Sequence, residues 1–196
     1  MPNVATIAEL VRADRAVRRF AQEPVGLDVL RELVDIARLV HSGANQQPLR
    51  YALVASSDEC ERVFAHLRWA AALPDWEGPA FDERPVAYIV ICRDREIGNA
   101  GGQDQGIAAE VISLAATERG LAACIVGAFD GSGVAEAVGI GEAYQPLLVV
   151  ALGVAGETVV LEPVGEDGDT KYWRDAAGVH HVPKRALEDV IIATAP

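Results

Sequence analysis

Hydrophobic residues recur every three or four positions in several stretches of the chain, which is the spacing of one face of an α-helix. The clearest stretch predicts a helix over residues 27–40, and its apolar stripe consists of Leu27, Leu30, Leu33, Val34, Ala37 and Val40. A second long helix is predicted over residues 104–119, where small side chains are frequent and Gly120 suits the position after a helix. Shorter helices are predicted over residues 4–13, 58–71 and 184–192, and another that ends at Val138.

Apolar runs of strand length alternate with these helical stretches. Residues 86–91 form a largely β-branched apolar run, which predicts a central strand covered on both faces. Further strands are predicted over residues 50–55, 121–126 and 146–154. At 196 residues the chain is long enough for one sizeable core, so we expect a single domain over residues 1–196.

Composition and charge narrow the class of protein. The chain is 51% hydrophobic, which is typical of a globular protein and not of a disordered one. Its net charge of −12 argues against nucleic acid as a partner, because phosphate backbones need a basic face. The longest apolar run, residues 146–155, is far shorter than the roughly 20 residues that cross a bilayer. No membrane segment is therefore expected.

The cysteines and the N-terminal residues indicate where in the cell the protein is found. Cys60, Cys92 and Cys124 are widely spaced and odd in number, which favours buried thiols over a disulfide framework or a zinc site. Residues 1–4 carry none of the basic character that opens a secretory signal. We therefore expect a cytoplasmic protein.

Basic residues gather at one place in this acidic chain. Arg12, Arg15, Arg18 and Arg19 fall within eight residues. Such a cluster repels itself unless it meets an anion or acidic neighbours. Two readings stay open: a solvated helix end, or a phosphate site in which one or two arginines use their fork of donors.

Two loops carry unusual residues. Residues 41–48 (His-Ser-Gly-Ala-Asn-Gln-Gln-Pro) are either an ordinary helix-to-strand connection or a backbone that approaches a ligand and donates hydrogen bonds to it. Residues 73–85 combine three prolines with Trp76 and Phe81, which excludes a regular helix. An aromatic loop of this kind either packs on the core or covers a site.

Several common site types are disfavoured. The turn after Val126 has the spacing Gly-x-x-x-Gly-x-Gly, which does not match the dinucleotide fingerprint of a Rossmann domain. His180 and His181 are adjacent, so on a strand they point to opposite faces and do not both ligate one metal ion. The chain has no evident acid–base or nucleophile constellation, which is typical of enzymes whose cofactor supplies the chemistry.

Several segments, taken in order, resemble the nitroreductase family of flavin mononucleotide (FMN) proteins. Residues 14–20 (Asp-Arg-Ala-Val-Arg-Arg-Phe) resemble its Arg-Arg-Ser-x-Arg-x-Phe motif, and residues 41–48 resemble its Pro-Ser-x-x-Asn-x-Gln-Pro-Trp loop. Residues 104–121 resemble the family's central helix, and residues 125–130 and 151–153 resemble the two strands after it. Residues 182–188 resemble its basic C-terminal segment. Asp14 and Ala16 depart from the motif, because the family often has arginine and serine there.

The resemblance implies an α+β fold, in which helices wrap a central, mostly antiparallel sheet, and an intertwined homodimer with FMN at the interface. The resemblance implies that Arg15 and Arg18 approach the phosphate and the pyrimidine end of the flavin, and that Ser42, Gly43 and Asn45 come from the partner subunit toward the phosphate and ribose. Val126, Gly127 and Ala128 are expected beside the isoalloxazine ring, and Lys184 and Arg185 at the phosphate. The full set of FMN-binding positions carried over is Arg15, Ala16, Arg18, Ser42, Gly43, Asn45, Gln47, Val126, Gly127, Ala128, Lys184 and Arg185.

The same resemblance implies an oxidoreductase. In such an enzyme, hydride is expected to pass from NAD(P)H to flavin N5 and then to a small conjugated acceptor, such as a nitroaromatic or a quinone, by a ping-pong scheme without a catalytic side chain or a metal. Residues 67–85, with Trp69, Trp76 and Phe81, are expected to wall or cover the substrate site, and residues 157–196 to embrace the partner. The alternative is a flavin-binding or storage protein, or a flavin-consuming or dehalogenating relative, with little NAD(P)H turnover.

Overall fold

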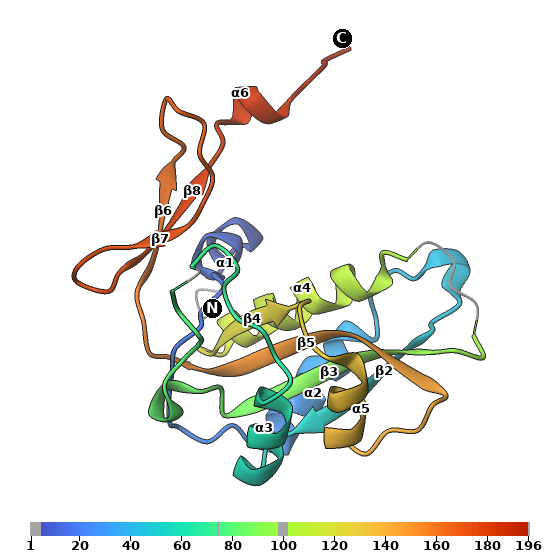
Figure 1. Ribbon diagram of the computed structural model, residues 1–196. Helices are drawn as coiled ribbons and strands as arrows, with labels where there is room; N and C mark the ends of the chain where they lie inside the picture. Colours follow the sequence, from blue (N-terminus) through green and yellow to red (C-terminus); the bar gives the residue numbers. More distant parts are fainter. Residues whose placement is uncertain (1–4, 74, 98–101, 196) are drawn as a thin grey trace.

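The computed structural model describes residues 5–73, 75–97 and 102–195, and a five-stranded antiparallel sheet lies at its centre (Figure 1). Its strands are β1 (Phe20–Ala21), β2 (Leu49–Val54), β3 (Ala87–Asp94), β4 (Ala122–Val126) and β5 (Tyr144–Ala155). Residues 149–152 of β5 pair with β3 on one side and with β4 on the other. β2 pairs with β3, and β1 adds to the end of β5 through the pair Phe20 and Ala155. β5 is therefore the strand with which β1, β3 and β4 all pair.

Helices cover both faces of this sheet. α2 (Leu27–Ala37) and α4 (Asp104–Glu118) pack on one face, while α3 (Ser57–Phe64) and α5 (Gly131–Ala137) pack on the other (Figure 1). Successive side chains of β3 alternate between the two layers, so that Ile89 joins the α2 and α4 core and Val90 joins the α3 and α5 core. Both side chains are fully buried, which explains why the strand is apolar without interruption.

The N-terminal segment, residues 6–19, is held by a helix cap at its start and by a hydrogen bond to β4 after α1. α1 (Ile7–Ala13) begins at a capping box, in which the Thr6 hydroxyl and the Glu9 carboxylate each satisfy a backbone N–H of the other residue. After α1 ends, the backbone N–H of Val17 donates to the carbonyl of Ala123 in β4 at 3.0 Å. Residues 14–19 therefore run beside the sheet edge.

Residues 157–195 form a C-terminal arm that leaves the sheet after β5 and projects away from the body (Figure 1). In the arm, β8 (His180–Lys184) pairs in parallel with β6 (Val159–Pro163) and antiparallel with β7 (Trp173–Arg174). The short α6 (Leu187–Val190) follows. Large apolar side chains are exposed at this end of the arm, at Leu187, Val190, Ile191 and Ile192.

Most elements expected from the sequence are confirmed. The long helices end within three residues of their predicted limits, and β3 is the central buried strand. The α+β class with an antiparallel sheet wrapped by helices is also confirmed. All three cysteines are free and buried, as expected. Within the described ranges, no helix combines the length and apolarity that a membrane crossing requires.

The helix predicted over residues 58–71 is wrong after Phe64. Instead of continuing the helix, the chain takes its backbone hydrogen bonds from the turn after β4. The N–H of Arg68 donates to the Ala128 carbonyl at 2.9 Å, and the His66 carbonyl accepts from the N–H of Asp130 at 3.0 Å. Tertiary pairing has replaced the local helical pattern, and Ala70 then adopts a positive φ of 43° that no helix allows.

The helix predicted over residues 184–192 is wrong in most of its length. Lys184 ends β8, where its carbonyl accepts the N–H of Val164 at 3.0 Å, and α6 covers four residues only. The two-residue β1 and the strand β6 were not expected from the apolar pattern. The expectations for residues 1–4 and for Pro74 lie outside the described residues.

Candidate functional site

A cavity of about 370 Å³ opens between residues 14–18, α4, β4 and the C-terminal arm. We call it the cation cavity, because Arg15, Arg18 and Lys184 all line it. Ala16 lines it too, so four predicted positions from two distant parts of the sequence, residues 15–18 and Lys184, meet here. Ala16 is fixed by a β-bridge to Ala123, and Lys184 is delivered by the last residue of β8.

The three cations of this cavity have no carboxylate partner within the described part of the chain. The side-chain hydrogen bonds of Arg15 and Arg18 go to backbone carbonyls and to an imidazole. Two acidic residues, Asp14 and Glu110, line the cavity without reaching these cations. The Asp14 carboxylate instead accepts the Ser113 hydroxyl hydrogen at 2.7 Å. Unpaired cations gathered in one cavity of an acidic protein are suited to bind an anion.

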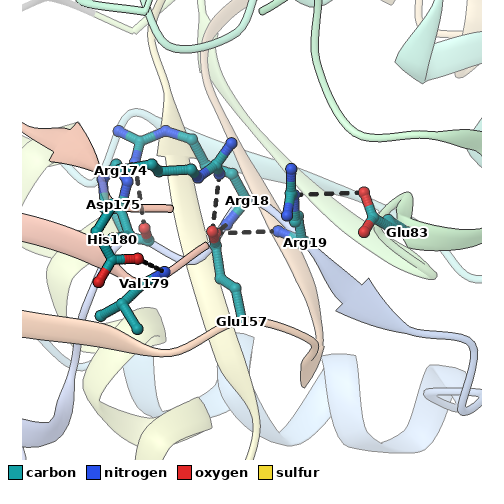
Figure 2. Close-up of polar contacts among 9 residues, drawn as sticks. Arg18, Arg19, Glu83, Glu157, Arg174, Asp175, Val179 and His180 are labelled. Carbon is teal, nitrogen blue, oxygen red and sulfur yellow. Dashed lines mark hydrogen bonds and ion pairs between the residues drawn. The ribbon is translucent and has the colours of Figure 1, made fainter. Parts of the chain in front are cut away.

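Arg18 is held by neutral groups of the C-terminal arm (Figure 2). Its Nη1 donates to His180 Nε2 at 3.1 Å and to the Ala16 carbonyl at 3.3 Å. The guanidinium carbon lies 4.6 Å from the ring centroid of Tyr172, within cation–π range. These contacts fix the direction of the side chain and leave its charge without a counter-ion.

The tautomer of His180 follows from the same contact. A guanidinium has no acceptor, so His180 Nε2 must accept and the ring proton lies on Nδ1. His180 is fully buried, and burial together with the neighbouring Arg18 charge lowers the pKa of this imidazole to about 4. His180 is therefore a neutral acceptor at physiological pH.

Glu157 anchors the arm to the N-terminal segment (Figure 2). Its Oε1 accepts the backbone N–H groups of Arg18 at 2.5 Å and Arg19 at 3.2 Å, and its Oε2 pairs with Arg174 Nη2 at 2.7 Å. The Glu157 side chain is 2% exposed. Gly156 makes this approach possible, because a Cβ there would lie 3.0 Å from the backbone carbon of Phe20.

Residues 42–47 form a second, separate structure, which we call loop 42–47. The Ser42 hydroxyl donates to Asp104 Oδ2 at 2.6 Å and accepts the N–H of Gln47 at 2.9 Å, while Gly43 N–H donates to Asp104 Oδ1 at 3.2 Å. Because a hydroxyl has one hydrogen, Ser42 has none left to donate to a ligand in this conformation. Asp104 lies in the first turn of α4, where the helix dipole stabilises a carboxylate.

The backbone of this loop is strained. Ala44, Asn45 and Gln47 have φ values of 49°, 54° and 49°, a region that side chains other than glycine rarely adopt. Ser42 and Gln47 line a cavity of about 180 Å³ that also includes Tyr51 and Asp104. Burial, and then the Asp104 charge, raise the pKa of Tyr51 to about 12. Within one chain, loop 42–47 does not line the cation cavity.

The predicted flavin-ring residues lie at the end of β4. Val126 is buried in the core, Gly127 is exposed, and the Ala128 carbonyl accepts the N–H of Arg68. The neighbouring Ile125 is 38% exposed and lines the cation cavity. Alternation along a strand explains this difference, since Ile125 and Val126 face opposite sides of the sheet. Ile125 was missed from the sequence.

The predicted lid residues do not gather at one place. Trp69 stacks on Phe64, with ring centroids 5.8 Å apart, and Trp76 covers the guanidinium of Arg174 at 4.3 Å. Phe81 is 72% exposed and lines another cavity, beside α3. The start of the segment nevertheless lies beside the flavin-ring positions, through the bridge between Leu67 and Phe129.

Arg185 lines a different, open cavity of about 780 Å³ between β6, β8 and α6, which it shares with Lys184. The adjacent histidines of β8 face opposite ways, as expected: His180 meets Arg18, while His181 Nδ1 lies 2.9 Å from Glu162. Within the described ranges, no group of three or more His, Cys, Asp or Glu residues is arranged to hold a metal ion.

Sequence reasoning missed the residues that support Arg18, which are Glu157, Tyr172, Arg174 and His180. The tail did show unusual features, in the run at residues 171–174 and in the histidine pair. Glu157 stands in an acidic chain with no local signal. The meeting of these residues follows from the path of the C-terminal arm.

Comparison with known proteins agrees with this architecture. The model of the Nitroreductase family matches residues 11–154. A protein provisionally named NADH dehydrogenase/NAD(P)H nitroreductase, from Xanthomonas oryzae pv. oryzae (strain PXO99A), is 38% identical over 56 residues. That match spans 29% of this chain and 29% of the relative's length.

Solved structures share the fold over a longer range. An FMN and NADPH-dependent nitroreductase, NfnB from Sphigopyxis sp. strain HMH, aligns with a TM-score of 0.67 at 19% identity, over 97% of this chain and 100% of the other. A nitroreductase family protein from Clostridium novyi NT aligns with a TM-score of 0.64 at 18% identity, over 95% and 100%. At these identities the structures establish a common fold. Since the family model also covers most of the chain, the protein belongs to the nitroreductase family.

Proposed function

We propose that this protein is an FMN-dependent oxidoreductase that carries reducing equivalents from NAD(P)H to a small conjugated acceptor, such as a nitroaromatic or a quinone. The observation that best supports this is the cation cavity, where Arg15, Arg18 and Lys184 meet without a carboxylate partner among the described residues. A phosphate dianion needs several such donors. The FMN-dependent nitroreductases among the structural relatives supply the class of ligand.

FMN, when bound, supplies the redox chemistry at its N5, and the residues of the chain bind and orient it. We assign Arg15 and Lys184 to the phosphate, and Arg18 to the pyrimidine end, where a cation stabilises negative charge. Ile125 offers the same cavity an exposed apolar surface. Arg185 contributes from the neighbouring cavity that it shares with Lys184.

A second copy of the chain is proposed to complete the site. Loop 42–47 lines a different cavity from the cation cavity of its own chain. We propose that its backbone groups bind the flavin held by the partner. Exposed apolar side chains on α1, α4 and the end of the arm are available to an interface, and they include Ile7, Val11, Ile107, Leu187, Val190 and Ile192. We propose an intertwined homodimer in which residues 157–196 reach the partner.

The lid role of residues 67–85 also remains a proposal. Trp76 contacts Arg174, which ties it to the C-terminal arm. Trp69 stacks on Phe64. It follows by two residues the bridge between Leu67 and Phe129, which lies beside the turn after β4. We expect Trp76→Ala to raise the Michaelis constant for the acceptor more than the dissociation constant of FMN. An equal loss of both would contradict a lid.

The experiment is a visible spectrum of the purified protein, followed by anaerobic addition of NADH and then NADPH. Flavin bands that bleach are expected and would identify the donor. Bands that persist would move the assignment to a flavin-binding, storage or flavin-consuming role. A colourless protein that FMN does not reconstitute would contradict the proposal.

Arg15→Ala tests the cavity itself. Loss of one charge-assisted hydrogen bond of about 1.5–3 kcal/mol should weaken FMN binding by roughly 10–100-fold in a fluorescence titration. Arg12→Ala is the matched control, since Arg12 bonds to the Ala8 carbonyl and does not line the cavity. Equal FMN affinity in the two variants would argue against the assignment.

A further inference from the structure

The C-terminal arm reaches the cation cavity through two layers of contact. In the first layer, His180 and Tyr172 touch the guanidinium of Arg18 directly. In the second layer, Glu157 binds the backbone N–H of Arg18 and ties it to Arg174 (Figure 2). Both layers come from residues more than 130 positions away in the chain.

The contacts of Arg18 are directional, and they are neutral. An arginine side chain has many rotamers, and ordering it in water costs conformational entropy. The acceptor lone pair of His180 and the ring face of Tyr172 restrict these rotamers without cancelling the positive charge. A carboxylate in the place of His180 would fix the side chain equally well but would neutralise the charge that a bound anion needs.

The remaining contacts of His180 hold it in this role. Its backbone N–H donates to the Thr158 carbonyl at 2.8 Å, and its ring lies against Tyr172, with ring centroids 5.1 Å apart. Glu157 stands one residue before Thr158, so the same turn of the arm fixes the imidazole and the Arg18 backbone. The arm and the arginine segment are thus oriented as one unit.

We propose that His180 and Glu157 are positioning residues for Arg18, His180 at the guanidinium and Glu157 at the backbone, so that the arm is part of the same subunit's flavin site. The inference rests on the FMN site proposed above. Glu157 does not line the cation cavity and acts only through Arg18, and we assign the effect of His180, which does line it, to its contact with Arg18 as well. Removing either residue matters for FMN binding only while Arg18 is present.

A double-mutant cycle on FMN affinity tests this dependence. We expect His180→Leu to weaken FMN binding about tenfold, because Arg18 loses its imidazole acceptor and keeps only the Ala16 carbonyl. His180→Gln should stay close to the wild type, because its amide oxygen accepts the same hydrogen bond. The double variant Arg18→Ala, His180→Leu should bind FMN as Arg18→Ala does. If the two effects multiply, His180 acts independently of Arg18 and the inference is wrong.

His181→Leu is the matched control, since His181 lies next in sequence on the opposite face of β8 and contacts Glu162 and Asp175. Its FMN affinity should stay within about twofold of the wild type. If His180→Leu does not fold, as judged by circular dichroism, the cycle is run with Tyr172→Leu, which removes the ring beneath Arg18. Glu157→Gln enters a third cycle with Arg18→Ala in the same way.

The outcomes separate the two proposals. A wild-type protein that does not bind FMN would overturn both the proposed function and this inference. A wild-type protein that binds FMN, with multiplicative effects in every cycle, would overturn the positioning role alone. Coupled effects at His180 with an unaffected His181→Leu variant would support both.

Discussion

The cation cavity and loop 42–47 are each organised by one buried carboxylate that accepts backbone N–H groups, but the two carboxylates differ in their surroundings. Glu157 holds the N–H groups of Arg18 and Arg19 and is also ion-paired with Arg174. Asp104 holds the Gly43 N–H and the Ser42 hydroxyl, and it has no ion pair within the described residues.

The difference shows two ways to keep a buried charge. Glu157 is stabilised by a cation and joins segments 139 positions apart, so its loss separates two parts of the fold. Asp104 is stabilised by the N-terminus of α4 and, from 62 positions away in the chain, shapes the single loop 42–47. We therefore expect that loss of Glu157 lowers the stability of the whole fold, whereas loss of Asp104 mainly changes the backbone conformation of loop 42–47.

Glu157→Ala should have the largest effect. It leaves the largely covered Arg174 without its carboxylate and two N–H groups without an acceptor, so we expect a loss of about 3–5 kcal/mol in the free energy of unfolding by urea. Asp35→Ala is the control, because its ion pair with Arg38 is exposed and should contribute less than about 1 kcal/mol. A Glu157→Ala variant as stable as this control would remove the contrast between the two carboxylates.

Asp104→Ala should cost less, about 2–3 kcal/mol, since two hydrogen bonds to a charged group are lost but no cation is left unpaired. The same variant should make loop 42–47 sensitive to proteolysis, because three residues there lose support for a positive φ. Gln105→Ala, the next residue in α4, removes a hydrogen bond to Gly102 and should leave the loop protected. Equal proteolysis of the two variants would contradict the role of Asp104.

The adjacent histidines of β8 should respond to pH in opposite directions. The unfolded chain protonates His180 below about pH 6.5, whereas the folded state does so near 4, so the free energy of unfolding falls as the pH drops between these values. We expect a difference of about 3 kcal/mol, which His180→Gln removes.

His181 behaves differently, because hydrogen bonding to Glu162 raises its pKa. Its contribution is present below the unfolded pKa and is lost as the pH rises through its own raised pKa. Titration of the imidazole resonances by NMR measures both values. A His180 that titrates above His181 would reverse the assignment of the buried, neutral ring.

Ala44→Gly should have the smallest effect and the opposite sign. Ala44 has a φ of 49°, where glycine has no steric cost, so we expect a gain of about 0.5–1 kcal/mol. Ala65→Gly, at an ordinary helical φ of −58°, should lose a similar amount. Matching signs in the two urea titrations would show that loop 42–47 is not strained.

The sequence predicted the fold well where elements are long. The stripe of residues 27–40 and the unbroken apolar run of β3 each specify an element and its buried face, because burial of many side chains decides the structure there. Short elements escaped, since the two residues of β1 carry no periodicity. The helix over residues 58–71 was predicted too long because pairing with Ala128 and Asp130 outweighs local helical preference.

The site was predicted unevenly for a similar reason. Arg15 and Arg18 lie close together in a short basic motif that is visible in the sequence alone. Glu157 and His180 reach Arg18 only because Gly156 lets the chain cross close to Phe20 and the arm then turns back. No local pattern encodes such a crossing, so Glu157 and His180 are harder to predict from the sequence than the arginines of the basic motif.

The position of β5 has a consequence for the order of folding during synthesis. β1, β3 and β4 all take β5 as a partner, yet β5 is made after each of them. Among the strands that the structure describes, β1 and β4 pair with β5 alone, so until residue 155 has left the ribosome the only pair of the central sheet that can form is β2 with β3. We therefore expect the central sheet to close only once β5 is available, and the C-terminal arm to reach Arg18 after that.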